Sequence, residues 1–213
     1  MFYQNCRDAK DISWELLLKY KINSLPVKIS SICKGEGILL CPFQKAEKNI
    51  QQLGWGASMR SNDGFAIVIR GKKHIFWDDA LSVKRQRFAI AHELGHYING
   101  DVGDIPTRRN CDPDDRDDEI ERKANIVASR ILAPACVLWG LGINNAEGLS
   151  EVCDISMQAA QWRMRRMHYL YERENQFLKL SGKSYFLQSA QEKQVYRQFE
   201  SWIKEQREWS KET

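Results

Sequence analysis

The sequence predicts an α+β protein, in which a small antiparallel sheet packs on two helices and a helical region follows. Three observations lead to this fold class. Two apolar runs between residues 65 and 77 flank a turn at Arg70-Gly71-Lys72, apolar residues recur at helical spacing on both sides of them, and no strand pattern follows Pro134. A chain of 213 residues, 43% hydrophobic and 28% charged, can bury a full core. We therefore expect a mixed domain over residues 1–140 and a helical region over 141–213.

The first half of the chain alternates short helices and strands, which proline and glycine delimit. Helices are expected at 8–21, from Pro26 to about Cys33, and at 43–53; strands are expected at 38–41, ended by Pro42, and in a hairpin at 65–69 and 74–77.

The second half is expected to be helical. Helices are predicted at 83–98, 118–133, 147–153, 156–178 and 184–209. Ser82 and Ser156 stand at N-cap positions, and Asn99-Gly100 and Pro134 are stop signals. The polar segment 100–117 between the first two of these helices is expected to be a surface loop.

The strongest chemical signal is the segment His92-Glu93-Leu94-Gly95-His96 within the first of these helices. Two histidines four residues apart lie on one face of a helix, so both imidazoles can reach one metal ion. The glutamate beside the first histidine can then activate a water molecule at that metal. This H-E-x-x-H arrangement is typical of zinc hydrolases that cleave peptides.

A catalytic zinc site needs a third protein ligand, which must come from another element. His74, His168 and many acidic residues, among them Asp101 and Asp104, are available. Glu121 is favoured because it lies on a following helix, with Asn125 on the same face and small residues beside it. Asn125 is expected to hydrogen-bond a ligand histidine and fix its tautomer. Glu119 is the reserve candidate, and His168 stays open.

These segments resemble the ImmA/IrrE family of bacterial and phage-associated zinc metallopeptidases. The resemblance rests on Ile75–Trp77, Arg87–His96, the pattern Glu121-x-x-Ala124-Asn125-x-x-Ala128 and Ile131–Pro134, with a weaker helix-turn-helix-like stretch from Leu149 to Arg166. It implies a zincin-like fold for residues 1–140 and makes Glu121 the third zinc ligand. Val127 and Ala133 depart from the family pattern, where an aromatic residue and a methionine are common.

The resemblance implies a Zn²⁺ ion on His92, His96 and Glu121, with Glu93 as the catalytic general base. The sequence does not name a second donor for the oxyanion. Tyr97 and His168 are the candidates, although a core position suits the tyrosine better and a solvated or capping position suits the histidine better.

Two further segments admit a structural and a functional interpretation. The acidic run 112–119 lacks the glycine and the closing glutamate of a calcium loop, so a solvated loop is favoured. The stretch 149–163, followed by Arg165 and Arg166, is compatible with a DNA-recognition helix. Because residues 161–213 carry a net charge of only +4, a helical hairpin that packs on the protein or grips a partner is favoured, and DNA contact stays possible.

The function expected from the resemblance is site-specific, zinc-dependent cleavage of a helix-turn-helix transcriptional repressor, which derepresses a mobile element, a prophage or a stress regulon. The alternative is a non-proteolytic antirepressor, DNA-binding regulator or toxin-module component with a structural or vestigial metal. Six scattered cysteines without a C-x-x-C pair, no long apolar stretch and no signal-peptide pattern predict a cytoplasmic protein without membrane contact. The tail 181–213 is expected either to occlude the cleft or to be a solvated helix that packs through Trp202 and Trp209.

Overall fold

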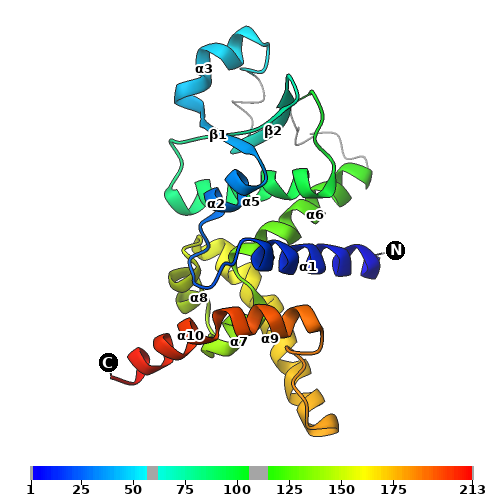
Figure 1. Ribbon diagram of the computed structural model, residues 1–213, viewed down its shortest axis with the longest axis vertical. Coiled ribbons are helices and arrows are strands. Elements are labelled where there is room, and N and C mark those ends of the chain that lie inside the picture. Colours follow the sequence, from blue (N-terminus) through cyan, green and yellow to red (C-terminus); the bar gives the residue numbers. More distant parts are fainter. Residues whose placement is uncertain (1, 57–61, 106–114, 213) are drawn as a thin grey trace. The chain divides into compact units, whose positions relative to one another are not determined.

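The computed structural model describes residues 2–56, 62–105 and 115–212 (Figure 1). Its elements in chain order are α1 (Phe2–Lys19), α2 (Ile29–Gly35), β1 (Ile38–Pro42), α3 (Phe43–Gln52), β2 (Gly64–Ile69), β3 (Lys72–Trp77), α5 (Val83–Asn99), α6 (Asp115–Leu132), α7 (Ala135–Leu141), α8 (Ala146–Cys153), α9 (Met157–Ser181) and α10 (Ala190–Glu212). The predicted α+β class with a helical C-terminal region is confirmed.

The chain forms two compact units. Residues 1–12 and 28–128 make the first unit, and residues 13–27 and 129–213 make the second. Helices α1 and α6 each contribute residues to both units. The predicted boundary at residue 140 separates a mixed domain from a helical region of the sequence and does not refer to these compact units. It stays a prediction.

The sheet of the first unit has the strand order β1-β3-β2. Strands β2 and β3 form the predicted antiparallel hairpin, whose turn at Arg70 and Gly71 has φ of 49° and 74°, as a two-residue type I′ turn requires. Strand β1 pairs with β3 in parallel, so the prediction of a wholly antiparallel sheet was wrong. The reason is the connection: α3 and the residues after it separate β1 from the hairpin, and such a crossover permits parallel pairing.

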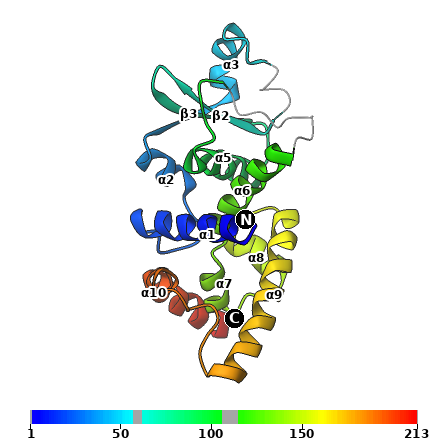
Figure 2. The same cartoon turned by 90° about the vertical axis from the view of Figure 1, so that its right-hand side faces the viewer.

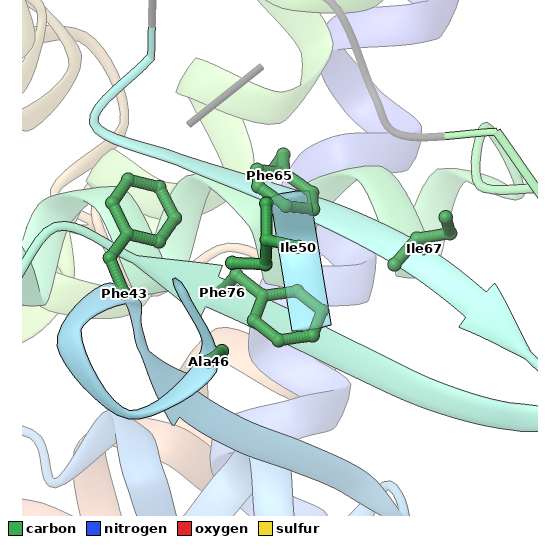
Figure 3. Packing of buried hydrophobic residues seen from close by; sticks show 6 residues of the cluster. All are labelled: Phe43, Ala46, Ile50, Phe65, Ile67 and Phe76. Atoms are coloured by element: carbon green, nitrogen blue, oxygen red, sulfur yellow. The ribbon is translucent and has the colours of Figure 1, made fainter. Parts of the chain in front are cut away.

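Helices cover both faces of this sheet (Figure 2). Helix α3 packs on one face through Phe43, Ala46 and Ile50, which meet Phe65, Ile67 and Phe76 of the hairpin (Figure 3). The rings of Phe65 and Phe76 stack with centroids 5.1 Å apart. Helix α5 lies against β2 and β3 on the opposite face, with α2 beside it. The sheet is thus the rigid layer that supports α5.

Helix α5 begins and ends where the sequence predicts. Ser82 is its N-cap residue by position, although its side chain makes no capping hydrogen bond. Gly100 ends the helix at φ 81°, a left-handed conformation that glycine adopts without strain. Eight consecutive residues, Ala89–His96, are buried, including both histidines and Glu93.

Some predicted limits differ from the structure. Helix α2 begins at Ile29, three residues after Pro26, so Pro26 does not open it. Helix α7 was not predicted; Pro134 is its N-cap residue as well as the stop of the preceding helix. Helix α10 begins at Ala190 rather than at 184. Residues 106–114, which are half of the predicted loop 100–117 and the start of the acidic run, lie outside the described residues. Residues 115–119 of that run belong to α6, so the prediction of a loop was wrong for them.

The second unit is helical. Helix α10 packs on α7, where a Cβ atom on Gly140 would lie 2.7 Å from the Tyr196 ring. Val195, Phe199 and Ile203 are the buried hydrophobic residues of α10. The tail was expected to pack through Trp209, but 74% of this side chain is exposed.

One stretch of the described chain is long and apolar enough to cross a membrane. It covers Glu119–Leu141, and 61% of its most apolar window is buried inside the protein. The core helix of a soluble domain passes the same test, so this stretch gives no evidence for a membrane.

Candidate metal centre

Helix α5 places two imidazoles side by side. His92 and His96 are 3% and 2% exposed, and their Nε2 atoms lie 3.0 Å apart. The four-residue spacing places the rings on one helical face, edge to face with centroids 4.7 Å apart, and the apolar residues around them keep that face in the core. The two ring nitrogens therefore point to a common position.

Helix α6 brings a carboxylate to the same position. Glu121 Oε2 lies 3.2 Å from His92 Nε2, and Glu121 Oε1 lies 3.4 Å from His96 Nε2. The two helices can approach this closely because Gly95 has no side chain. A Cβ atom there would lie 2.8 Å from the carbonyl oxygen of Ala124 and 2.9 Å from its Cα atom.

The three side chains fit a tetrahedral metal site. A zinc ion with ligand bonds of about 2.0–2.1 Å needs neighbouring ligand atoms roughly 3.3 Å apart. The observed separations of 3.0, 3.2 and 3.4 Å match that requirement. Two imidazoles and a carboxylate are also a ligand set of catalytic zinc sites. Within the described residues, His92, His96 and Glu121 are the group that can hold a metal ion.

A hydrogen bond orients the first histidine. His92 Nδ1 lies 3.0 Å from Asn125 Oδ1, which only accepts, so Nδ1 donates the proton. Nε2 faces Glu121, 3.2 Å from Oε2, and would give up its own proton to bind a metal ion through its lone pair. The sequence predicted this contact for Asn125.

The outer nitrogen of the second histidine has a weaker neighbour. His96 Nδ1 is buried without a hydrogen bond, and Asp101 Oδ2 lies 3.6 Å away. The Asp101 amide donates to the His96 carbonyl at 3.0 Å, which ties this carboxylate to the end of α5. Asp101 therefore interacts with His96 through its charge rather than through a hydrogen bond.

Neighbouring groups shift the pKa values of Glu121 and His96 so that the charged form of each is favoured. Burial alone raises the pKa of Glu121, but hydrogen bonds from His92 and His96 outweigh it and hold the pKa well below its usual range. Burial lowers the pKa of His96, but the hydrogen bond to Glu121 and the charges of Glu93, Glu121 and Asp101 outweigh it and raise the pKa. Negative charge thus surrounds a position where a cation fits.

Glu93 lies next to His92, His96 and Glu121 and is not one of the three candidate metal ligands. Its side chain is 6% exposed, and its Cγ atom would lie 3.6 Å from a Cβ atom on Gly64 of β2. This is an ordinary van der Waals distance; the short contact of such a Cβ atom would be with the Phe76 carbonyl oxygen, at 2.8 Å. The Glu93 charge also contributes to the raised pKa of His96.

The other candidate residues lie elsewhere. The Tyr97 hydroxyl sits between β2 and β3, 2.6 Å from the carbonyl oxygen of Ile67 and 2.9 Å from that of His74, so it ties α5 to the hairpin. Burial raises the pKa of this hydroxyl to about 12. Glu119 pairs with Lys123 at 3.3 Å, and His168 belongs to the second unit, 3.4 Å from the Asn144 carbonyl oxygen.

Two features of the site were not predicted from the sequence. No role within the histidine motif was predicted for Gly95, although a glycine inside a helix usually indicates close packing. Asp101 was one of many acidic candidates. Its position directly after the stop at Gly100 was the available signal, because the chain turns back there towards the end of α5.

This fold and this cluster define a class of protein. An H-E-x-x-H helix that packs on a small sheet and meets a glutamate from the next helix is the arrangement of a metallopeptidase. A family model described as Peptidase_M78, the IrrE N-terminal-like domain, matches residues 36–165, more than half of the chain. The chain therefore belongs to this peptidase family. No curated protein matches it.

Proposed function

We propose that this protein is a zinc-dependent, site-specific endopeptidase whose substrate is a helix-turn-helix transcriptional repressor. Cleavage of the repressor derepresses the genes of a mobile element, a prophage or a stress regulon. The observation that carries the proposal is the convergence of His92, His96 and Glu121 with Glu93 beside them. Membership of a peptidase family supports the same activity.

His92, His96 and Glu121 would hold the zinc ion in this mechanism. When bound, zinc polarises water and the scissile carbonyl and stabilises the charge that develops on the carbonyl oxygen. Glu93 accepts the proton of the attacking water as general base and delivers it to the leaving amine. Asn125 keeps the His92 ring in the tautomer that leaves Nε2 unprotonated.

The structure narrows the choice of an oxyanion donor. The Tyr97 hydroxyl is engaged with the backbone of β2 and β3, so it does not serve in this role. We propose a cytoplasmic location, which the absence of a disulfide at Cys33, Cys41, Cys136 and Cys153 supports.

The metal assignment is tested first by elemental analysis of the purified protein. Wild type is expected to hold near one zinc per chain, and Glu121→Ala is expected to lose it. Glu119→Ala is the matched control, because its carboxylate pairs with Lys123 on the same helix. Zinc retained by Glu121→Ala would contradict the ligand assignment, and metal-free wild type would favour a non-proteolytic regulator.

The activity is tested by incubating the zinc-loaded protein with candidate helix-turn-helix repressors from the same genome, with mass spectrometry of the fragments. Glu93→Gln is expected to keep zinc and to lose cleavage, because glutamine cannot accept the proton. Full cleavage by Glu93→Gln would remove Glu93 from the base role. Zinc binding without cleavage of any repressor would contradict the proposed substrate.

A further inference from the structure

Helices α8 and α9 of the second unit form a helix-turn-helix. Three residues, Asp154, Ile155 and Ser156, join them, and Asp154 has the left-handed conformation, with φ 51° and ψ 52°. The Ser150 hydroxyl donates to the Ile155 carbonyl at 2.7 Å, and Ser156 caps α9 through the Ala159 amide. These bonds hold the turn in one conformation, so the second helix has a defined direction relative to the first.

One face of α9 is anchored in the second unit. The buried apolar residues of α8, of the turn and of this face of α9 are Leu149, Cys153, Ile155, Ala160, Met164 and Met167. Arg163 is also buried and donates from Nε and Nη2 to the Ala133 carbonyl oxygen, at 2.9 and 2.6 Å. The anchored face therefore determines which residues of α9 point to solvent.

The opposite face of α9 is exposed and continuous. Gln158, Gln161, Trp162 and Arg165 follow the spacing of one helical stripe, and all four are exposed. The Trp162 side chain is 65% exposed. Trp162 lies among exposed arginines, and tryptophan and arginine are residue types that binding surfaces favour.

The exposed face is also basic. Residues 155–171 contain no aspartate or glutamate, although 28% of the whole chain is charged. The guanidinium of Arg165 stacks 4.6 Å from the Trp162 ring centroid, and those of Arg166 and Arg173 stack 4.8 and 5.2 Å from that of Tyr169. Stacking orders a guanidinium while its N–H groups stay available to an anion.

We propose that this face of α9 binds duplex DNA in the major groove. Gln158, Gln161 and Arg165 occupy the first turns of the second helix, where such motifs contact base edges, and glutamine and arginine are side chains that read bases. Arg166 and Arg173, which stack on Tyr169 beside this stripe, are expected to contact phosphates. DNA contact is thus a second activity of the chain, separate from peptide cleavage.

A protein partner is the other class of ligand that tryptophan, tyrosine and arginine serve. DNA is favoured because the fixed turn presents the start of α9 outward and no acidic side chain interrupts residues 155–171. The low net charge of the C-terminal region favoured simple packing in the sequence alone. For DNA binding, the residues exposed on this one face of α9 matter more than the net charge of residues 161–213.

The test is fluorescence anisotropy of the full-length protein with a labelled 30-base-pair duplex of mixed sequence, across a range of salt concentrations. Each phosphate contact adds about 0.9 to the slope of log affinity against log salt. The double variant Arg165→Gln/Arg166→Gln is expected to weaken binding at least roughly 10-fold and to reduce that slope by about 1 to 2. Both residues are exposed, so the thermal midpoint is expected to stay unchanged.

The matched control is Lys45→Gln/Lys48→Gln on α3, which removes two exposed positive charges from the other unit. Its binding is expected to equal that of wild type. The proposal is overturned if wild type does not bind duplex DNA, if the control loses affinity equally, or if single-stranded DNA binds more tightly. If the α9 double variant still binds DNA but no longer binds the repressor, this face docks a protein. That result would also overturn the proposal.

Discussion

Helices α5 and α9 both carry polar side chains at helical spacing, but the two patterns face different surroundings. On α5, His92, Glu93 and His96 are buried, and the two histidines point to a common position with Glu121. On α9, Gln161, Trp162 and Arg165 face solvent, and Arg163 between them is turned into the core. The difference is that buried polar groups must satisfy one another or a ligand, whereas exposed ones are satisfied by water. Burial therefore makes α5 a candidate for chemistry and leaves α9 a candidate for surface recognition.

Removal of a buried ligand is expected to have the largest effect. His96→Ala is expected to abolish zinc binding and the stabilisation that zinc confers, which is about 2.7 kcal/mol at a zinc concentration 100 times the Kd. Differential scanning fluorimetry with and without zinc measures it. His74→Ala, which removes an imidazole outside the cluster, is expected to keep the full response. An unchanged zinc response in His96→Ala would show that the buried histidine of α5 does not bind the metal. The contrast between a buried ligand site on α5 and an exposed surface on α9 would then be lost.

Closing the gap between α5 and α6 is expected to act nearly as strongly. In Gly95→Ala the new Cβ would lie under 3.0 Å from backbone atoms of Ala124, so the helices must separate. Overpacking of this kind costs about 1–3 kcal/mol, and it moves Glu121 away from the histidines. The measurements are the thermal midpoint and zinc affinity. Gly103→Ala is the control, since a Cβ there meets nothing within 4 Å. A Gly95→Ala protein with wild-type zinc affinity would show that the close approach does not position Glu121.

Loss of the orienting groups is expected to have a smaller effect. Asn125→Ala removes the acceptor of the His92 Nδ1 proton and is expected to weaken zinc binding about 10-fold. Asp101→Ala is expected to weaken it less, because Asp101 Oδ2 lies 3.6 Å from His96 Nδ1 without a hydrogen bond. Zinc titration with a competing chelator ranks the two variants. The reverse order would show that charge, rather than hydrogen bonding, orients this site.

The smallest expected effect is the pH dependence of the metal-free protein. The pKa of His96 is raised above 6.5, so its protonated form adds stability that is complete below pH 6.5 and disappears as the pH rises through the folded value. The pKa of Glu121 is lowered below 4.5, so its ionised form adds stability above pH 4.5 that disappears as the pH falls through the folded value.

His96 and Glu121 together therefore stabilise the metal-free protein most between pH 4.5 and pH 6.5. Thermal midpoints measured after chelation from pH 5 to 8 are expected to fall towards pH 8 in wild type. The fall is expected to be shallower in Glu121→Gln, where His96 loses its charged partner. Equal slopes in the two proteins would show that Glu121 does not hold the proton on His96.

The sequence alone specified those features of the protein that depend on local geometry. The four-residue spacing of His92 and His96 brings their rings together in any helix, and Gly100 ends that helix because it adopts a left-handed conformation. The hairpin follows from two apolar runs and a short turn that contains Gly71. Each of these features needs only a few neighbouring residues.

Tertiary structure decided the features that depend on contacts between distant segments. It selected Glu121 over Glu119 as the carboxylate that meets the histidines, because Gly95 lets α6 approach α5 on that side. It also made β1 parallel to β3, and it turned Arg163 into the core while Trp162 and Arg165 stay exposed. Periodicity shows that a helix has faces, but the neighbour that covers a face depends on how the whole chain packs.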